Sequence, residues 1–275
     1  MTVLLHISDT HFGTEQPLVL QALVEWAQLC RPDLVVLSGD ITQRARPGQF
    51  RAARQFVDRL GAPALVVPGN HDIPLFDLGA RMMHPYARYS AEFGALLEPV
   101  LSLSDLLLVG VNTTRAWRHK NGVVSAQQVE RVARLLGAAS REQLRVVVVH
   151  QPLAVTQAAD LPNVLHGHSA AQRAWAAAGA DLVLGGHIHL PYVLPLSGLA
   201  RPMWVVQAGT AISSRLRPGV PNSFNLLRWG GAAAADAERT PDQHIGSCSV
   251  EQWDYAAARN AFVCARIARV FPARG

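Results

Sequence analysis

Short apolar runs, many of them β-branched, alternate with helix-like stretches along most of the chain. Runs of this kind are typical of parallel strands that are buried on both faces. The strand-like runs are 3–7, 34–37, 64–67, 106–111, 145–149, 182–184 and 203–207. Apolar residues at helical spacing predict helices over 18–29, 47–60, 125–136 and 172–178. The alternation of the two patterns predicts an α/β fold.

Three segments depart from this alternation. Residues 73–104 begin irregularly, with Pro74 and Pro85 as breakers, and we expect a cover over a site. Residues 230–246 are Gly, Ala and polar residues without a period, which predicts a mobile surface loop. Residues 247–255 and 261–271 alternate around a turn, which predicts a terminal antiparallel hairpin. No repeat or linker divides the chain, so a single domain over 1–275 is expected.

Composition narrows the class of protein. With 275 residues, 49% of them hydrophobic, the chain can bury a sizeable core. The formal charge is +5, but the arginines are scattered, so no dedicated nucleic-acid surface is indicated. Cys30, Cys248 and Cys264 lack metal-knuckle spacing and are expected to be reduced structural thiols. No basic start precedes a long apolar segment, and no run is long enough for a membrane span, so a cytoplasmic protein is expected.

Polar residues follow most of the predicted strands at the point where each strand ends. In α/β folds the carboxyl ends of parallel strands meet at one edge, where functional groups gather. The residues are Asp9, His11, Asp40, Asn70, His71, His150, His187 and His189. Imidazole and carboxylate ligands suit zinc, iron or manganese, and two such ions about 3.5–4 Å apart can clamp the oxygens of a phosphoryl transfer. The sequence therefore predicts a dinuclear metal site that acts on a phosphoester.

The order and spacing of these residues resemble a known family. The chain is similar to the calcineurin-like metallophosphoesterases through Asp9-x-His11, Gly39-Asp40, Gly69-Asn70-His71-Asp72, His150 and Gly186-His187-x-His189. Each motif alone is common in turns, but the set is specific. The resemblance implies a four-layer α-β-β-α sandwich of two mixed sheets, with the metal site at the carboxyl ends of the strands.

The resemblance also implies a role for each residue. One ion, manganese, iron or zinc, would be held by Asp9, His11, Asp40 and His189. The other would be held by Asp40, Asn70, His150 and His187, with Asp40 as the bridge. Metal-bound hydroxide would attack phosphorus, and His71 would contact the phosphoryl group with Asn70 and protonate the leaving oxygen as general acid. Asp72 would orient His71.

Other polar residues are weaker candidates. Arg44 lies four residues after Asp40 and is expected to reach a substrate phosphate. Asn112 and Arg115 follow a strand end, and His166 and His168 imitate the later His-x-His pair without its strand-then-glycine context. Four more histidines are expected to be structural or to face solvent: His6, His84, His119 and His244.

Differences from the motifs of related branches narrow the range of expected substrates. The segment from Gly39 to Ala45 lacks the extended motif of the Ser/Thr protein phosphatases, and Gln43 stands where purple acid phosphatases have a tyrosine. The chain after His189 is too short for the DNA-capping domain of the repair nucleases. The sequence is most similar to the bacterial cyclic-nucleotide and glycerophosphodiester phosphodiesterases, although many of these have His-His-Pro-Pro where this chain has His150-Gln151-Pro152-Leu153.

We therefore expect hydrolysis of a small phosphodiester such as a 3′,5′-cyclic nucleotide. Two alternatives stay open at this point: a pyrophosphatase that acts on a nucleotide-linked lipid precursor, and a non-catalytic scaffold on the same fold. The lipid alternative predicts an apolar groove beside the site, within 73–97. A homodimer is allowed.

Overall fold

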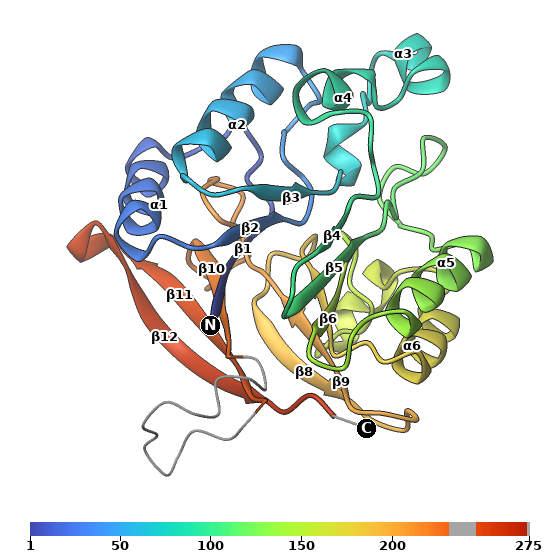
Figure 1. Cartoon of the computed structure of the whole chain (residues 1–275). Coiled ribbons are helices and arrows are strands. Elements are labelled where there is room, and N and C mark those ends of the chain that lie inside the picture. The colour runs from blue at the N-terminus through green and yellow to red at the C-terminus, as the bar shows by residue number, and fades with distance from the viewer. Residues whose placement is uncertain (231–245, 274–275) are drawn as a thin grey trace.

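The computed structural model describes residues 1–230 and 246–273, and these form two six-stranded β-sheets that pack face to face (Figure 1). The first sheet has the order β12-β11-β10-β1-β2-β3. Its strands are β1 (Thr2–Ile7), β2 (Leu34–Leu37), β3 (Ala64–Val66), β10 (Ser223–Trp229), β11 (Cys248–Ala256) and β12 (Ala261–Val270). Strands β1, β2 and β3 are parallel, and the remaining strands join through antiparallel pairs.

The second sheet has the order β4-β5-β6-β7-β9-β8. Its strands are β4 (Val100–Ser102), β5 (Leu106–Gly110), β6 (Leu144–Val148), β7 (Leu182–Gly185), β8 (Tyr192–Leu196) and β9 (Met203–Gln207). The four central strands are parallel, and β4 and β8 are antiparallel edges. Both sheets are therefore mixed.

Helices cover the outer face of each sheet, which gives four layers (Figure 1). The first sheet is covered by α1 (Pro17–Cys30) and α2 (Pro47–Arg59), and the second by α5 (Ala126–Gly137) and α6 (His168–Ala177). A third apolar cluster fills the space between the sheets. The predicted α-β-β-α sandwich is confirmed.

The position of β1 in the sandwich explains why its sequence is almost continuously apolar. Leu5 and Ile7 pack with the helices of the outer layer, whereas Leu4 packs into the cluster between the sheets. Because successive side chains point to opposite faces of a sheet, a strand that is buried on both faces needs apolar residues at nearly every position. His6, on the inner face, is the polar exception and is fully buried.

The cover segment has its own short elements, α3 (Leu78–Met83), α4 (Ala87–Phe93) and β4. Tyr89 on α4 contacts Phe50 on α2 and Phe93 on α4, so part of this segment belongs to the outer layer rather than to a lid. Three short 3₁₀ helices complete the described elements: η1 (Asn70–Asp72), η2 (Ala158–Asn163) and η4 (Ala257–Arg259).

The terminal hairpin of β11 and β12 is confirmed, and its turn uses Asn260 in a left-handed conformation. Three strands were not predicted: β4, β8 and β10. The last of these is central, because it pairs with β1 and joins the hairpin to the parallel strands. The loop predicted at 230–246 lies almost wholly outside the described residues. Over residues 1–230 and 246–273, none of the helices combines the length and apolar character that crossing a bilayer requires.

Candidate metal centre

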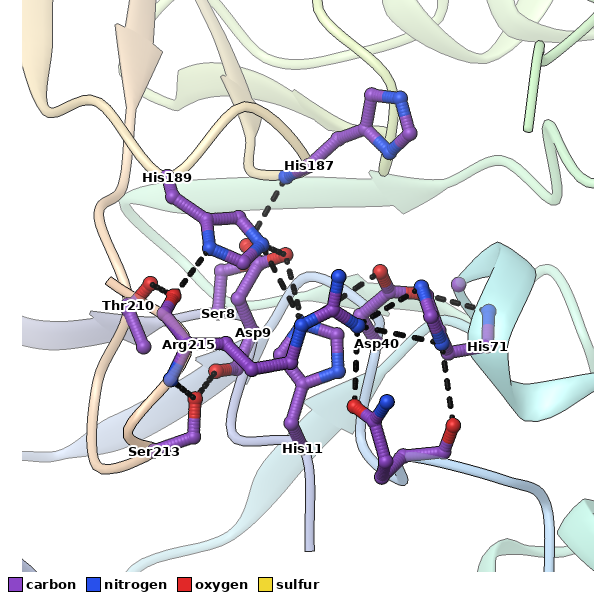
Figure 2. A network of polar contacts seen from close by, with 12 residues as sticks. Ser8, Asp9, His11, Asp40, His71, His187, His189, Thr210, Ser213 and Arg215 are labelled. Carbon is purple, nitrogen blue, oxygen red and sulfur yellow. Dashed lines mark hydrogen bonds and ion pairs between the residues drawn. The ribbon is translucent and has the colours of Figure 1, made fainter. Parts of the chain in front are cut away.

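The predicted ligands meet where the carboxyl ends of the parallel strands of both sheets come together. Asp9 and His11 follow β1, Asp40 follows β2, and Asn70 opens η1 after β3. The second sheet contributes His150 after β6, and His187 and His189 after β7. Figure 2 shows Asp9, His11, Asp40 and His189 with their polar atoms directed toward one another.

One set of ligand atoms consists of Asp9, His11 and His189. The Nε2 atom of His189 lies 3.2 Å from Oδ1 of Asp9 and 3.3 Å from Nε2 of His11. The Nε2 atom of His11 lies 3.7 Å from Asp9 Oδ1 and 3.8 Å from Oδ2 of Asp40. The potential ligand atoms of Asp9, His11 and His189 lie within 4.8 Å of one another, so one metal ion could bind all three.

A second set consists of Asp40, His150 and His187. Asp40 Oδ1 lies 3.2 Å from His150 Nε2, and the three potential ligand atoms lie within 4.8 Å of one another. Asn70 lines a cavity together with Asp40 and His187. Asp40 also lies close to His11. Potential ligand atoms of His11, Asp40 and His71 form a further group in which all atoms lie within 4.8 Å of one another. Asp40 thus stands between the two sets, as a bridging ligand would.

Unpaired buried atoms show that these residues fit metal ions. Six buried side-chain atoms of the predicted ligands have no hydrogen-bond partner: Asp9 Oδ1, His11 Nδ1, Asn70 Oδ1, His150 Nε2, and both ring nitrogens of His187. Of these, Asp9 Oδ1 and His150 Nε2 have only the ion-pair contacts given above. A buried polar atom without a partner costs roughly 1–3 kcal/mol. A metal ion on either side of Asp40 would satisfy most of these atoms at once.

The carboxylates and imidazoles shift one another's protonation strongly. Burial would lower the pKa of His150, but the Asp40 carboxylate outweighs it and raises the value to about 9. Burial, together with the charge of His150, lowers the pKa of His187 to about 3. The pKa of Asp9 lies well below its ordinary value, because His189 and His11 outweigh the opposing effect of burial. Carboxylates that stay anionic and a neutral His187 are forms that bind a metal, whereas a metal ion would have to displace the proton that Asp40 favours on His150.

Backbone strain is concentrated at these residues. Eight non-glycine residues in the described ranges have positive φ, and five of them are predicted ligands: Asp9, His11, Asp40, His187 and His189. Left-handed backbone is unfavourable for side chains other than glycine and is found where the surrounding structure enforces it. The strand ends and the loops between them fix these conformations.

Close approach explains two of the motif glycines. A Cβ atom at Gly69 would lie 2.0 Å from the backbone nitrogen of Asp40, and one at Gly186 would lie 2.5 Å from Asp9 Oδ2. At both positions the missing side chain lets two loops that carry predicted ligands come close together.

His71 faces the cavity, and its ring is positioned by a backbone carbonyl. Nδ1 lies 3.1 Å from the carbonyl oxygen of Gln43, which can only accept, so Nδ1 is the donor and Nε2 faces the centre. Asp72 makes different contacts from the one that was predicted. It accepts hydrogen bonds from the backbone of Ile41, Thr42 and Gly69 and from the Thr42 hydroxyl. The orientation of the His71 ring thus comes from Gln43, and Asp72 ties together the loops after β2 and β3.

The cavity over the centre has a volume of about 250 Å³ and is polar. Its lining residues are Asp40, Asn70, His71, His119, Lys120, His187, His189 and Arg215. A second cavity of about 300 Å³ shares Lys120, His187, His189 and Arg215 and continues toward Asp160 and Arg217. His119, which was expected to be structural or solvent-facing, lies beside the predicted ligands.

The weaker candidates lie elsewhere. The guanidinium of Arg44 stacks over Phe76, 5.4 Å from the ring centroid, and Arg44 lines a separate pocket beside the cover segment. Arg115 bonds to the carbonyl of Asn112 and to Gln128, and so holds its own loop together. The backbone of His166 pairs with the segment 122–124, and His168 begins α6. The substrate role of Arg44 stays a prediction.

Arg215 is the site residue that motif analysis missed. It lies in the loop after β9, the last parallel strand of the second sheet, so the rule that located the other residues also points to this loop. Nothing in its local sequence marks it, because the residue stands eight positions beyond the strand end in a segment without a motif.

The structure is an α/β sandwich with two groups of potential metal ligands at the carboxyl ends of its parallel strands. The model of the calcineurin-like phosphoesterase family matches residues 2–191, and the chain belongs to that family.

Among curated proteins, the chain is 38% identical over 86 residues to a glycerophosphodiester phosphodiesterase of Enterobacter lignolyticus, covering 26% of this chain and 29% of the relative. It is 26% identical to a cAMP/cGMP dual specificity phosphodiesterase of Mycobacterium tuberculosis, covering 68% of this chain and 61% of the relative. The matches thus span less than two thirds of each relative. A dimetal phosphatase from Danio rerio shares the fold, with a TM-score of 0.65, 13% identity and 99% of both chains covered.

Proposed function

We propose that the chain is a metal-dependent phosphodiesterase that hydrolyses a small phosphodiester such as a 3′,5′-cyclic nucleotide. The buried atoms of Asp9, His11, Asn70, His150 and His187 that lack a hydrogen-bond partner carry this proposal, because two cations beside the cavity would satisfy most of them. Manganese, iron or zinc ions held there would supply a nucleophile near neutral pH and positive charge against the phosphoryl oxygens. Membership of the family supports the same reaction.

Residues of the chain would position the substrate and transfer the proton. Asp40 Oδ1 accepts the backbone N–H of His71 at 2.8 Å, so the predicted bridge also positions the predicted acid. The Gln43 carbonyl holds the proton on Nδ1 and leaves Nε2 of His71 toward the cavity. To act as the acid, His71 would carry a second proton, on Nε2, and pass it from there to the leaving oxygen, while Asn70 would contact the phosphoryl group beside it.

The cavity favours small polar substrates. Its lining is made of charged and hydrogen-bonding groups, and the adjoining space lies between Lys120, Asp160 and Arg217. A nucleoside or glycerol group is hydroxylated and fits such surroundings better than an acyl chain does. The names of the relatives from Enterobacter and Mycobacterium agree with this class of substrate.

The test is hydrolysis of bis(p-nitrophenyl) phosphate by the purified, manganese-loaded protein. We expect turnover, and we expect His71→Ala to lose about 10²–10⁴-fold in rate while it keeps two metal ions, since it removes proton transfer but no ligand. His84→Ala removes an exposed histidine of the cover segment and serves as the control. Full activity of His71→Ala would remove His71 from the mechanism. A wild-type protein that holds two metals but cleaves no phosphoester would contradict the whole proposal.

One observation favours the alternative of a nucleotide-linked lipid substrate. Four apolar side chains of the cover segment are exposed: Phe76, Leu78, Met82 and Met83. They lie within the region where that alternative expects an apolar groove. A panel of cyclic nucleotides, glycerophosphodiesters, monoesters and nucleotide-sugar lipids separates the two, since our proposal requires faster turnover of the small diesters. The cytoplasmic location, the homodimer and the identity of the metals stay predictions.

A further inference from the structure

Arg215 reaches the metal centre from two directions. Its backbone carbonyl accepts a hydrogen bond from His189 Nδ1 at 2.5 Å, which leaves Nε2 of His189 for the metal side. Its side chain extends past His11 to His71, as Figure 2 shows. One residue therefore contacts a predicted ligand and the predicted acid.

The loop holds the backbone of Arg215 in place. The hydroxyl of Thr210 donates to the Arg215 carbonyl at 3.0 Å, and the Arg215 N–H donates to Ser213 Oγ at 3.3 Å. The side chain of Asn222 donates to the carbonyls of Thr210 and Ser213 at 3.3 and 2.9 Å. Thr210, Ser213 and Asn222 are buried. The loop thus aims the side chain before any substrate arrives, which limits the entropy lost on binding.

The guanidinium of Arg215 is hydrogen-bonded to an imidazole and an amide. Its Nη1 atom lies 3.0 Å from His71 Nε2 and 3.0 Å from Gln43 Oε1. Within residues 1–230 and 246–273, no carboxylate forms an ion pair with it. A permanently charged group in a polar cavity, with no carboxylate paired to it among the described residues, is expected to prefer an entering anion.

The residues that line the cavity indicate which part of the substrate would be this anion. Arg215 lines the cavity over Asp40, Asn70 and His71 and also the adjoining one beside Asp160. The phosphoryl group must lie next to the ligands and next to His71. Its non-bridging oxygens would therefore come within reach of the guanidinium, and planar guanidinium groups bind such oxygens in pairs.

We propose that Arg215 binds the non-bridging oxygens of the substrate's phosphoryl group and, in doing so, leaves Nε2 of His71 free to face the leaving oxygen. This rests on the proposed function for the identity of the substrate, but the anion site itself can be tested without turnover. Arg44, for which a substrate-binding role is also predicted, lines a separate pocket beside the cover segment.

The test is binding of inorganic phosphate to the manganese-loaded protein, measured by calorimetry. We expect Arg215→Gln to weaken binding about 10- to 100-fold, the usual effect of losing a charge-assisted hydrogen bond. Arg215→Lys should fall between that variant and the wild type, because lysine keeps the charge without the planar fork. In the phosphodiesterase assay, KM should rise more than kcat falls.

The charge-matched control is Arg54→Gln, which removes an exposed arginine paired with Asp58 on α2 and should leave phosphate affinity unchanged. Wild-type phosphate affinity in Arg215→Gln overturns the proposal. Loss of a metal ion from that variant also overturns it, since Arg215 would then act by supporting His189. If wild-type protein binds phosphate through Arg215 but hydrolyses no ester, the anion site stands and the phosphodiesterase function falls.

Discussion

At the scale of single residues, the metal centre depends on conformations that the local sequence disfavours. Asp9, His11, Asp40, His187 and His189 all have positive φ. Each such residue costs roughly 1–3 kcal/mol. The cost is tolerated because each residue is attached to a strand whose register is fixed by its neighbours in the sheet. Ligand atoms are thereby aimed at common points before any metal binds.

Gly69 tests how tightly the ligands are packed. Its φ of −101° suits any residue, so Gly69→Ala introduces a purely steric clash between the new methyl group and Asp40. We expect a loss of about 1–3 kcal/mol in the free energy of unfolding, together with weaker metal binding, since Asp40 must move. Chemical denaturation and metal analysis measure the two effects.

Gly137 provides the matched control for this substitution. A Cβ atom there meets nothing within 4 Å, and the residue is the last of α5. Gly137→Ala should leave stability equal or raise it by up to about 1 kcal/mol. If both variants have wild-type stability and metal content, the close approach of Gly69 to Asp40 is not needed for the centre.

At the scale of elements, local sequence signals define the start of α5. The Ser125 hydroxyl accepts the backbone N–H of Gln128 at 3.2 Å, and the Gln128 side chain accepts the N–H of Ser125 at 3.0 Å. This reciprocal pair satisfies two N–H groups that have no partner within the helix. Val129, Val132 and Leu136 then face the second sheet. A local cap and an apolar stripe together place this helix.

Ser125→Ala should therefore lower the free energy of unfolding by about 1 kcal/mol. Ser125→Asp keeps an acceptor at the cap and should retain most of the stability. Both variants should keep full phosphodiesterase activity, because α5 contributes no side chain to the cavity over the metal centre. Urea denaturation measures the difference, and equal midpoints for Ser125→Ala and the wild type would show that the cap contributes nothing.

At the scale of the whole molecule, a network of buried hydrogen bonds joins the two sheets beneath the metal centre. His6 Nε2 lies 3.0 Å from the Ser38 hydroxyl, and Asn225 Nδ2 lies 3.4 Å from His6 Nδ1 and 3.0 Å from the carbonyl oxygen of Gln207. The Ser38 carbonyl in turn lies 2.8 Å from Nδ1 of His150. The interior thus supports a predicted metal ligand through residues of β1, β9 and β10 and the loop after β2.

His6 makes stability depend on pH. Burial lowers its pKa from 6.5 to about 3, although the charge of Asp9 opposes this. Between these values the unfolded chain binds a proton that the folded protein excludes. The free energy of unfolding therefore falls as pH is lowered from 6.5 toward 3, by about 1.4 kcal/mol per pH unit for this one group.

His6→Gln removes this contribution and keeps a polar side chain. In the presence of a chelator, the free energy of unfolding of His6→Gln should fall less steeply with decreasing pH than that of the wild type. The two slopes should differ by about 1.4 kcal/mol per pH unit, which is the contribution of one proton. His187 is present in both proteins, so its own titration cancels in the comparison. Parallel stability profiles over this pH range would show that His6 is not held neutral by the fold.

The sequence by itself determined the central strands, most helix positions, the terminal hairpin and the family. It could do so because strands buried on both faces need continuous apolar runs, and because ligand residues must stand directly at strand ends. Glycines beside Asp40 and Asp9 were likewise predictable, since close approach excludes a side chain.

Only the tertiary structure decided which distant groups complete the site. Strand β10 has apolar and polar residues without a clear period, and its place beside β1 depends on pairing across more than 200 residues. Arg215 reaches His71 through a long loop, with a separation of 144 residues. The partners of His6 are Ser38 and Asn225, which come from distant segments that meet in the same sheet. Patterns between neighbouring residues indicate local hydrogen bonds and the face of a helix or strand on which each side chain lies. Contacts between distant segments, in contrast, form only when the sheets pack. The eight residues at strand ends were therefore visible in the chain, and the arginine we propose as their phosphate-binding partner was not.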